Sequence, residues 1–190
     1  MKKTLILVLF LLVWVNSADA RKYDWTNYKY RGRAYFDAKT YKQAIIEYTK
    51  ALELAPDDGQ ILYGLYLYRG QSYCFEKLYD NAIKDFTTAI EINPYDVAAY
   101  AERGNAYFQK GWLDQAAADL SRALSLKPDD GISYLYRAEV YYQMKEYKKA
   151  WGDLKMARVY GQPVKESLMQ DYERKALGRG AKKKQEMDLF

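Results

Sequence analysis

Apolar residues recur at spacings of three and four from about residue 25 to residue 163, with polar residues between them. This spacing places the apolar side chains on one face of an α-helix, so it predicts a series of amphipathic helices. The pattern returns with a period of about 34 residues, which indicates a stack of similar helix pairs. The predicted units are residues 25–58, 63–96, 97–130 and 131–163.

Each unit carries a tyrosine, an arginine and a small residue in the pattern Tyr-x-x-Arg-Gly or Tyr-x-x-Arg-Ala. The small residues are Gly32, Gly70, Gly104 and Ala138. Another tyrosine follows each small residue by three positions, and alanine follows it by twelve and by nineteen. Because small residues let two backbones approach closely, we expect the two helices of each unit to pack through these positions.

The ends of the helices are also marked. Proline closes the first three units at Pro56, Pro94 and Pro128. An aspartate precedes each unit or its first helix, and its carboxylate is a good acceptor for the unpaired N–H groups of a helix start: Asp24, Asp58, Asp96 and Asp130. The first linker holds about four additional residues, which equal one helical turn. The first helix of the second unit should therefore start one turn early.

These recurring positions resemble the tetratricopeptide repeat family over about residues 25–163. The resemblance implies an all-α fold, a right-handed α-solenoid of four helix-turn-helix units. Tyrosine stands where the family often has tryptophan and would fill the same packing role, at Tyr28, Tyr66, Tyr100 and Tyr134. A repeat stack needs an end that is apolar inward and polar outward, and residues 164–178 fit such a capping helix.

The family binds peptides or proteins on its concave face, which the first helix of each unit lines. The resemblance therefore assigns to a peptide-binding groove Lys29, Tyr30, Arg33, Phe36, Tyr68, Gln71, Phe75, Glu102, Asn105, Phe108, Tyr136, Glu139 and Tyr142. The alternative is that the aromatic members cover neighbouring units or the terminal helix. Some members clamp the C-terminal carboxylate of chaperones with Lys, Asn and Arg, but Leu67, Ala98 and Glu102 occupy the later positions here.

The arginine of each unit is followed sixteen residues later by an acid. The pairs are Arg31 with Glu47, Arg69 with Asp85, Arg103 with Asp119, and Arg137 with Asp153. We predict ion pairs that link the two helices of a unit or one unit to the next. The alternative is an arginine ladder that binds phosphate or nucleic acid.

The amino-acid composition excludes several kinds of metal site and catalytic mechanism. The chain has no histidine and only one cysteine, Cys74, which excludes a zinc site of the usual kind, an internal disulfide and histidine-based catalysis. Glu102 and Glu139 could in principle pair for glycoside hydrolysis, but they lie one unit apart. We therefore expect no catalytic residues, no metal, no cofactor and no enzymatic activity.

The first twenty residues have the pattern of a secretory signal peptide. Lys2 and Lys3 precede an apolar run over residues 4–15, and Ala18-Asp19-Ala20 offers small residues for cleavage after Ala20. The alternative is an uncleaved membrane anchor, but twelve apolar helical residues reach about 18 Å, short of a bilayer core of about 30 Å. We therefore expect a cleaved signal and no stable membrane span after cleavage. Residues 179–190, which include Lys182, Lys183 and Lys184, are predicted to form a basic, flexible tail.

The sequence thus predicts an exported scaffold or adaptor, periplasmic or secreted, that binds a protein or peptide in its groove. It could support assembly of an envelope or secretion complex. The alternative is a self-associating, homo-oligomeric structural subunit of an envelope assembly, with tyrosine-rich contact surfaces. We expect no nucleic-acid partner.

Overall fold

The computed structural model describes residues 24–178, and over that range the chain is helical with no strand. The chain divides into two compact units, the first ending at Leu78 and the second beginning at Tyr79. The all-α helical repeat that the sequence predicts is confirmed. The predicted signal peptide (residues 1–20) and basic tail (residues 179–190) lie outside the described residues.

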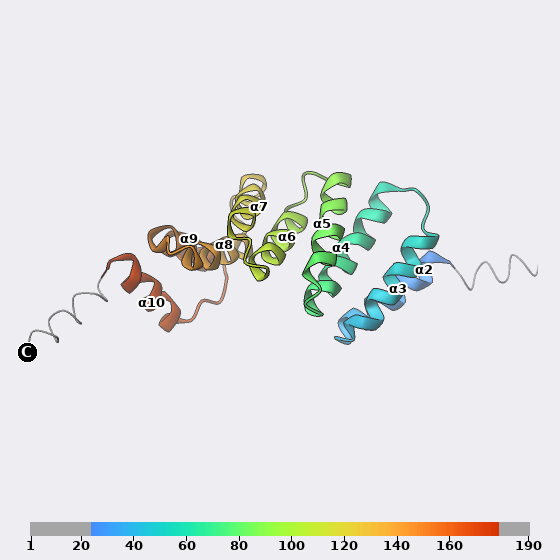
Figure 1. The fold of residues 1–190 in the computed structure, drawn as a ribbon, viewed down its shortest axis with the longest axis horizontal. Coiled ribbons are helices and arrows are strands. Elements are labelled where there is room, and N and C mark those ends of the chain that lie inside the picture. The colour runs from blue at the N-terminus through green and yellow to red at the C-terminus, as the bar shows by residue number, and fades with distance from the viewer. Residues whose placement is uncertain (1–23, 179–190) are drawn as a thin grey trace, which may run out of the picture. The chain divides into compact units, whose positions relative to one another are not determined.

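Between residue 24 and Leu78, the first unit contains α2 (Trp25–Asp37), α3 (Tyr41–Leu54) and α4 (Gly59–Phe75). Helix α3 packs against both α2 and α4 (Figure 1). The core residues are Ala44, Tyr48, Ala51 and Leu65. A Cβ atom at Gly32 would lie 2.8 Å from the buried ring of Tyr48, so the close approach of α2 to α3 depends on that glycine.

Over its described residues 79–178, the second unit contains six helices, each packed against the next in chain order (Figure 1). They are α5 (Tyr79–Ile92), α6 (Val97–Gln109), α7 (Leu113–Leu126), α8 (Gly131–Gln143), α9 (Tyr147–Val159) and α10 (Glu166–Ala176). Helices α6 and α8, which open the third and fourth repeats, also contact each other. Helix α10 falls within the predicted cap and packs on α9, where Met169 and Tyr172 enter the core.

The predicted helix starts are confirmed. Side chains of Asp24, Asp58, Asp96 and Asp130 accept hydrogen bonds from backbone N–H groups of the helices that follow. Helix α4 has 17 residues where α2, α6 and α8 have 13, and it begins in the first linker. The additional residues of that linker therefore form one further helical turn, as expected.

In the second compact unit, two of the predicted ion pairs each join the first helix of a repeat to the second helix of the same repeat. Arg103 donates to Asp119 from Nε to Oδ2 at 2.7 Å and from Nη2 to Oδ1 at 3.0 Å. Arg137 binds Asp153 in the same way at 2.7 and 2.9 Å. Burial alone would lower the pKa of each guanidinium, but the hydrogen bonds and charge of its aspartate raise that pKa overall. These pairs are therefore built into the interior.

In the first compact unit, the corresponding ion pair between Arg31 and Glu47 is more exposed on its arginine side. Nε of Arg31 lies 3.0 Å from Oε2 of Glu47, and the arginine side chain is 57% exposed, whereas that of Arg103 is 15% exposed. Arg69 and Asp85 belong to one repeat, but the boundary between the two compact units lies between them. Their pairing therefore stays a prediction.

A recurring hydroxyl group completes the arginine contacts. Nη1 donates to the preceding second helix, from Arg69 to Thr49, from Arg103 to Thr87 and from Arg137 to Ser121, at 3.0–3.1 Å. In the second unit each of these arginines thus joins its own repeat to the previous one. Sequence reasoning missed the hydroxyls, although each stands five residues after a core alanine.

Tyrosines enclose the same arginines. The guanidinium carbon of Arg103 lies 5.8 Å from the ring centroids of both Tyr100 and Tyr107, three residues before it and four after. Arg137 has the same arrangement at 5.7 Å with Tyr134 and Tyr141. Such stacking is favourable and shields the ion pair from water. The contacts support the structural interpretation of the arginines over a phosphate-binding ladder.

Candidate functional site

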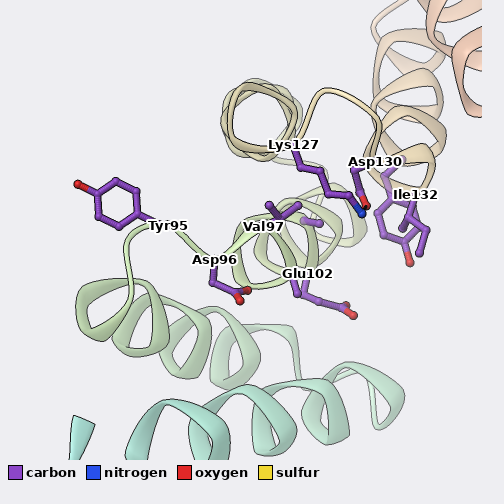
Figure 2. A pocket seen from close by; sticks show the side chains of 10 residues that line it. Tyr95, Asp96, Val97, Glu102, Lys127, Asp130 and Ile132 are labelled. Atoms are coloured by element: carbon purple, nitrogen blue, oxygen red, sulfur yellow. Dashed lines mark ion pairs between the residues drawn. The ribbon is translucent and has the colours of Figure 1, made fainter. Parts of the chain in front are cut away.

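A hollow of about 400 Å³ lies where α6 and α8 begin (Figure 2). Its lining comprises Tyr95, Asp96, Val97, Ala98, Ala101, Glu102, Lys127, Asp130, Ile132 and Tyr136. Much of this wall is aliphatic or aromatic. Ile132 is 46% exposed and Tyr95 is 74% exposed, with the Tyr95 ring pointing away from the other labelled side chains. The hollow therefore presents apolar surface that a ligand could cover.

Three carboxylates and one ammonium group surround this apolar wall. Asp96 accepts from the N–H of Ala99 at 2.9 Å and caps α6, while Asp130 caps α8. Nζ of Lys127 lies 3.7 Å from Oδ1 of Asp130 and offsets its charge. Asp96 and Glu102 are the other two carboxylates of the lining.

The first unit has a corresponding hollow of about 330 Å³ where α4 begins beside α2. Its lining comprises Lys29, Asp58, Gln60, Ile61, Gly64, Leu65 and Tyr68. Tyr68 and Tyr136 occupy the same repeat position, two residues before their small residues Gly70 and Ala138. This α2–α4 hollow thus contains the same tyrosine but balances one ammonium group against one carboxylate.

An arginine that is paired with an aspartate also lies beside the α2–α4 hollow. The guanidinium carbon of Arg33 lies 5.1 Å from the ring centroid of Tyr68, and its Nε donates to Asp37 at 3.0 Å. The hydrogen bond and charge of Asp37 raise the pKa of Arg33. Nζ of Lys29 lies 5.5 Å from the ring centroids of Trp25 and Tyr30. The tyrosine of this hollow is therefore bordered by cations.

Models of one repeat family match the chain in three places. A model described as TPR repeat matches residues 70–111 and 104–145, and a model described as tetratricopeptide repeat matches residues 25–58. Together the matches cover more than half of the chain. The chain belongs to the tetratricopeptide repeat (TPR) family. A comparison with curated proteins gave no match.

Solved TPR structures are similar to this chain. The first TPR of Spaghetti (RPAP3), bound to an HSP90 peptide, is 26% identical with a TM-score of 0.59, and the match covers 64% of this chain and 93% of that one. The second TPR domain of human RPAP3, in complex with an HSP70 peptide, is 27% identical with a TM-score of 0.54, covering 60% and 91%. MamA, at 21% identity, TM-score 0.67 and coverage of 77% and 84%, shares the fold.

The structure places the predicted groove residues of this TPR protein in two groups. Lys29 and Tyr68 line the α2–α4 hollow, and Glu102 and Tyr136 line the α6–α8 hollow. Tyr30 is 68% exposed outside both linings. The polar positions Gln71, Asn105 and Glu139 also fall outside the lining of these hollows. Burial raises the pKa of Glu139 above its ordinary value.

Other predicted groove aromatics pack within their units. Phe36 and Phe75 meet Tyr41, whose ring stacks on Phe75 with centroids 4.3 Å apart. Tyr142 stacks on Tyr172 of α10 with centroids 4.4 Å apart and donates a hydrogen bond to Asp171. Phe108 packs against the core around α6, α7 and α8. Each of these four residues thus has a packing contact, although Phe75 is 57% exposed, and their place in a peptide-binding groove stays a prediction.

Sequence reasoning missed several residues of the α6–α8 hollow. Val97 and Ile132 belong to the first turns of α6 and α8, and Lys127 lies in the loop before α8. The resemblance predicts binding residues in the middle of each first helix, and the sequence pattern at the helix starts predicts only capping. An exposed apolar residue just after a capping aspartate, as at Ile132, is the signal that could have indicated them.

The described residues contain no group of three or more Cys, Asp or Glu side chains arranged to hold a metal ion. Within residues 24–178, no helix is long and apolar enough to cross a membrane.

Proposed function

We propose that this TPR protein is a scaffold or adaptor that binds a segment of a partner protein along its first helices. One observation carries the proposal: each compact unit opens a hollow between first helices, and the same repeat tyrosine lines it, Tyr68 in one and Tyr136 in the other. An open hollow with an aromatic wall and a few charged groups suits a side chain of an extended or helical peptide.

The similar TPR domains of RPAP3 support this class of function, because both were solved with peptides. In the present chain Leu67, Ala98 and Glu102 stand at the later positions of the clamp by which some members of the family hold chaperone C-termini. We therefore propose peptide binding in general for this chain and a partner of its own.

The place of action is part of the same proposal. Residues 1–20 have the charge, apolar length and small residues of a secretory signal, which supports export to the periplasm or the medium. We propose that the partner is met there, in the assembly of an envelope or secretion complex. Cell fractionation with N-terminal sequencing tests export, and a mature chain starting at Met1 in the cytosol would contradict it.

Peptide binding is tested with the chain that begins at Arg21, which contains every described residue. A random peptide library is selected on this protein, and affinities are measured for a variant carrying Tyr68→Ala and Tyr136→Ala. We expect selected peptides to lose about tenfold or more in affinity, since buried aromatic contacts dominate such interfaces. The matched control is Val159→Ser, which changes an apolar residue that is 71% exposed outside both hollows.

Two results would overturn the proposal: no peptide enriched by selection, or enriched peptides that bind the double variant as tightly as the parent. Circular dichroism of each variant separates lost binding from lost folding. Light scattering of the parent distinguishes the scaffold from a structural subunit, because a scaffold stays monomeric at concentrations where a self-associating subunit assembles.

A further inference from the structure

We propose that the last repeat and the capping helix carry a basic surface that binds peripherally to an anionic membrane. The surface is a hollow of about 450 Å³, formed by the turn between α8 and α9, the start of α9 and the end of α10. This α9–α10 hollow is lined by Lys145, Glu146, Tyr147, Lys148, Lys149, Lys175, Ala176 and Gly178. The inference does not depend on peptide binding by the first helices and goes beyond it.

The α9–α10 hollow has an excess of positive charge. Its lining holds four lysines and one glutamate. That glutamate, Glu146, forms an ion pair with Lys149. Lys145 and Lys148 are exposed, and within residues 24–178 neither forms an ion pair. Their charges are therefore available to an anionic partner.

Lysine recurs at one turn position of the repeat. Lys145 follows α8 with a φ of 62°, and Lys39 and Lys77 stand at the equivalent turn of the first two repeats with φ of 58° and 60°. This left-handed conformation ordinarily favours glycine, which the third repeat has there as Gly111. Three repeats thus present a long cationic side chain on an exposed turn. Cations on several turns suit a surface with many anionic groups better than one acidic segment, which would contact a single hollow.

Carbon surface accompanies the charges of the α9–α10 hollow. Tyr147 and Ala176 belong to its lining, and the ring of Tyr147 packs edge-on against Tyr142 with centroids 5.4 Å apart. Nζ of Lys175 lies 4.2 Å from the ring centroid of Tyr142 and 3.8 Å from Oδ2 of Asp171, which offsets part of its charge. Lysine and tyrosine join an apolar body to a polar tip, so they suit the boundary between lipid headgroups and acyl chains.

The sequence continues from the rim of this hollow with more cations. Gly178 belongs to the lining, and Arg179, Lys182, Lys183 and Lys184 follow it in the chain. Basic clusters of about four to eight residues are attracted to anionic lipid surfaces, with about 1 kcal/mol for each side chain near the surface. The four lysines of the hollow and these four residues together reach that size.

The test measures how the chain from Arg21 partitions onto lipid vesicles. Vesicles of phosphatidylcholine alone are compared with vesicles that also contain phosphatidylglycerol, by co-sedimentation. We expect the chain to bind the anionic vesicles about tenfold more strongly, and added salt should weaken this binding because it screens the attraction.

Two double variants assign the binding to the hollow. Lys145→Gln with Lys148→Gln removes the two lysines that form no ion pair among the described residues, and binding to anionic vesicles should fall about tenfold. The matched control is Lys84→Gln with Lys165→Gln, which removes the same charge from two exposed lysines outside the lining. The control should weaken binding by no more than about twofold, because its lysines do not face the lipid.

Three results would overturn the inference. Equal binding to both kinds of vesicle would show no attraction to anionic lipid, and equal losses in the two double variants would mean that net charge alone attracts the chain. Replacing Lys182, Lys183 and Lys184 by glutamine should leave a preference for anionic vesicles, and its complete loss would assign the binding to the tail instead of the hollow.

A fluorescent peptide of alternating glutamate and leucine tests the other occupant. If this peptide binds the parent, is released by Lys145→Gln with Lys148→Gln, and the parent ignores vesicles, the hollow binds an acidic protein segment and the membrane proposal is wrong. Circular dichroism confirms that each variant is folded. Every one of these outcomes leaves peptide binding along the first helices intact, since that function is tested by Tyr68→Ala and Tyr136→Ala.

Discussion

The α2–α4 and α6–α8 hollows form at the same place in two different repeats, but different side chains line them. Each lies at the start of a first helix, beside a capping aspartate and a tyrosine at the same repeat position, Tyr68 or Tyr136. The side chains around them differ: Lys29 borders the first hollow, and Glu102 borders the second. Positions that hold the helices together recur in every repeat, whereas the positions between them are free to set the chemistry of binding.

The free energy of unfolding should be most sensitive to substitutions in the buried ion pairs. Asp119→Ala leaves the guanidinium of Arg103 without its carboxylate in a site where that side chain is 15% exposed. We expect a loss of about 3 kcal/mol in the free energy of unfolding, measured by urea denaturation.

The first unit provides the matched change for this prediction. Glu47→Ala breaks the pair with Arg31, whose side chain is 57% exposed and can be solvated by water. That variant should lose about 1 kcal/mol. Equal losses in the two variants would show that exposure of the arginine does not determine the contribution of the pair.

Close helix packing gives the next largest effect. A Cβ atom at Gly104 would lie 2.9 Å from Cγ of Leu120 and 3.3 Å from the backbone oxygen of Ala116. Gly104→Ala should therefore lower the free energy of unfolding by about 2 kcal/mol, because a fixed backbone atom resists relaxation. The control is Gly64→Ala in the α2–α4 hollow, where no atom lies within 4 Å.

Gly64→Ala should stabilise the chain by about 0.5–1 kcal/mol, since alanine has the higher helix propensity. Thermal unfolding of the two variants should shift in opposite directions. A stabilising effect of Gly104→Ala would mean that α6 and α7 can separate without loss.

Much of this framework could be predicted from sequence because the residues recur together. Arg103 and Asp119 keep the same spacing in other repeats, and that co-occurrence predicted their pair. Thr87 was missed because a single hydroxyl on a helix resembles any solvated polar residue. Its role depends on how consecutive repeats stack, which spacing within one repeat does not contain.

The site was less predictable for a related reason. The exposure of Ile132 could not be predicted, because it depends on how two first helices, α6 and α8, pack side by side, which the spacing within one repeat does not contain. The repeat position of Tyr142 matches that of Phe36 and Phe108, which predicts that it lines the groove. Its ring also stacks on Tyr172 of α10, a helix outside the repeat pattern, so the repeat alone does not predict this contact. The sequence thus predicts the contacts within a repeat more completely than the contacts between the last repeat and the helix that follows it.

A smaller effect tests the charge of the α2–α4 hollow directly. Lys29→Gln removes one cation from its lining, so a fluorescent peptide with glutamate on both sides of a leucine pair should bind about threefold more weakly, as expected for an exposed charge pair. The measurement is anisotropy in the Ile132→Ser background, which weakens the other hollow. An unchanged affinity would mean that Arg33, and not Lys29, provides the attraction.

The smallest expected effect concerns Glu139 on α8. Burial raises the pKa of its carboxyl above the ordinary value of 4.5, and the group interacts electrostatically with Tyr172 of α10. The folded chain therefore holds this proton to higher pH than the unfolded chain does. As pH rises from about 4.5, the free energy of unfolding should fall, because the carboxylate must ionise in a half-buried place.

Glu139→Gln removes this ionisation and keeps the shape of the side chain. The variant should be more stable than the parent at pH 7, by less than the Gly104→Ala effect, and the difference should vanish below the ordinary carboxyl pKa. Urea midpoints of both proteins across pH 3.5–7.5 check this. A constant difference over the whole range would show that glutamine alters packing, and a parent that gains stability relative to the variant as pH rises would mean that the carboxylate has a cationic partner. In either case the end of the repeat stack next to α10 would lack the pH dependence that burial of this group predicts.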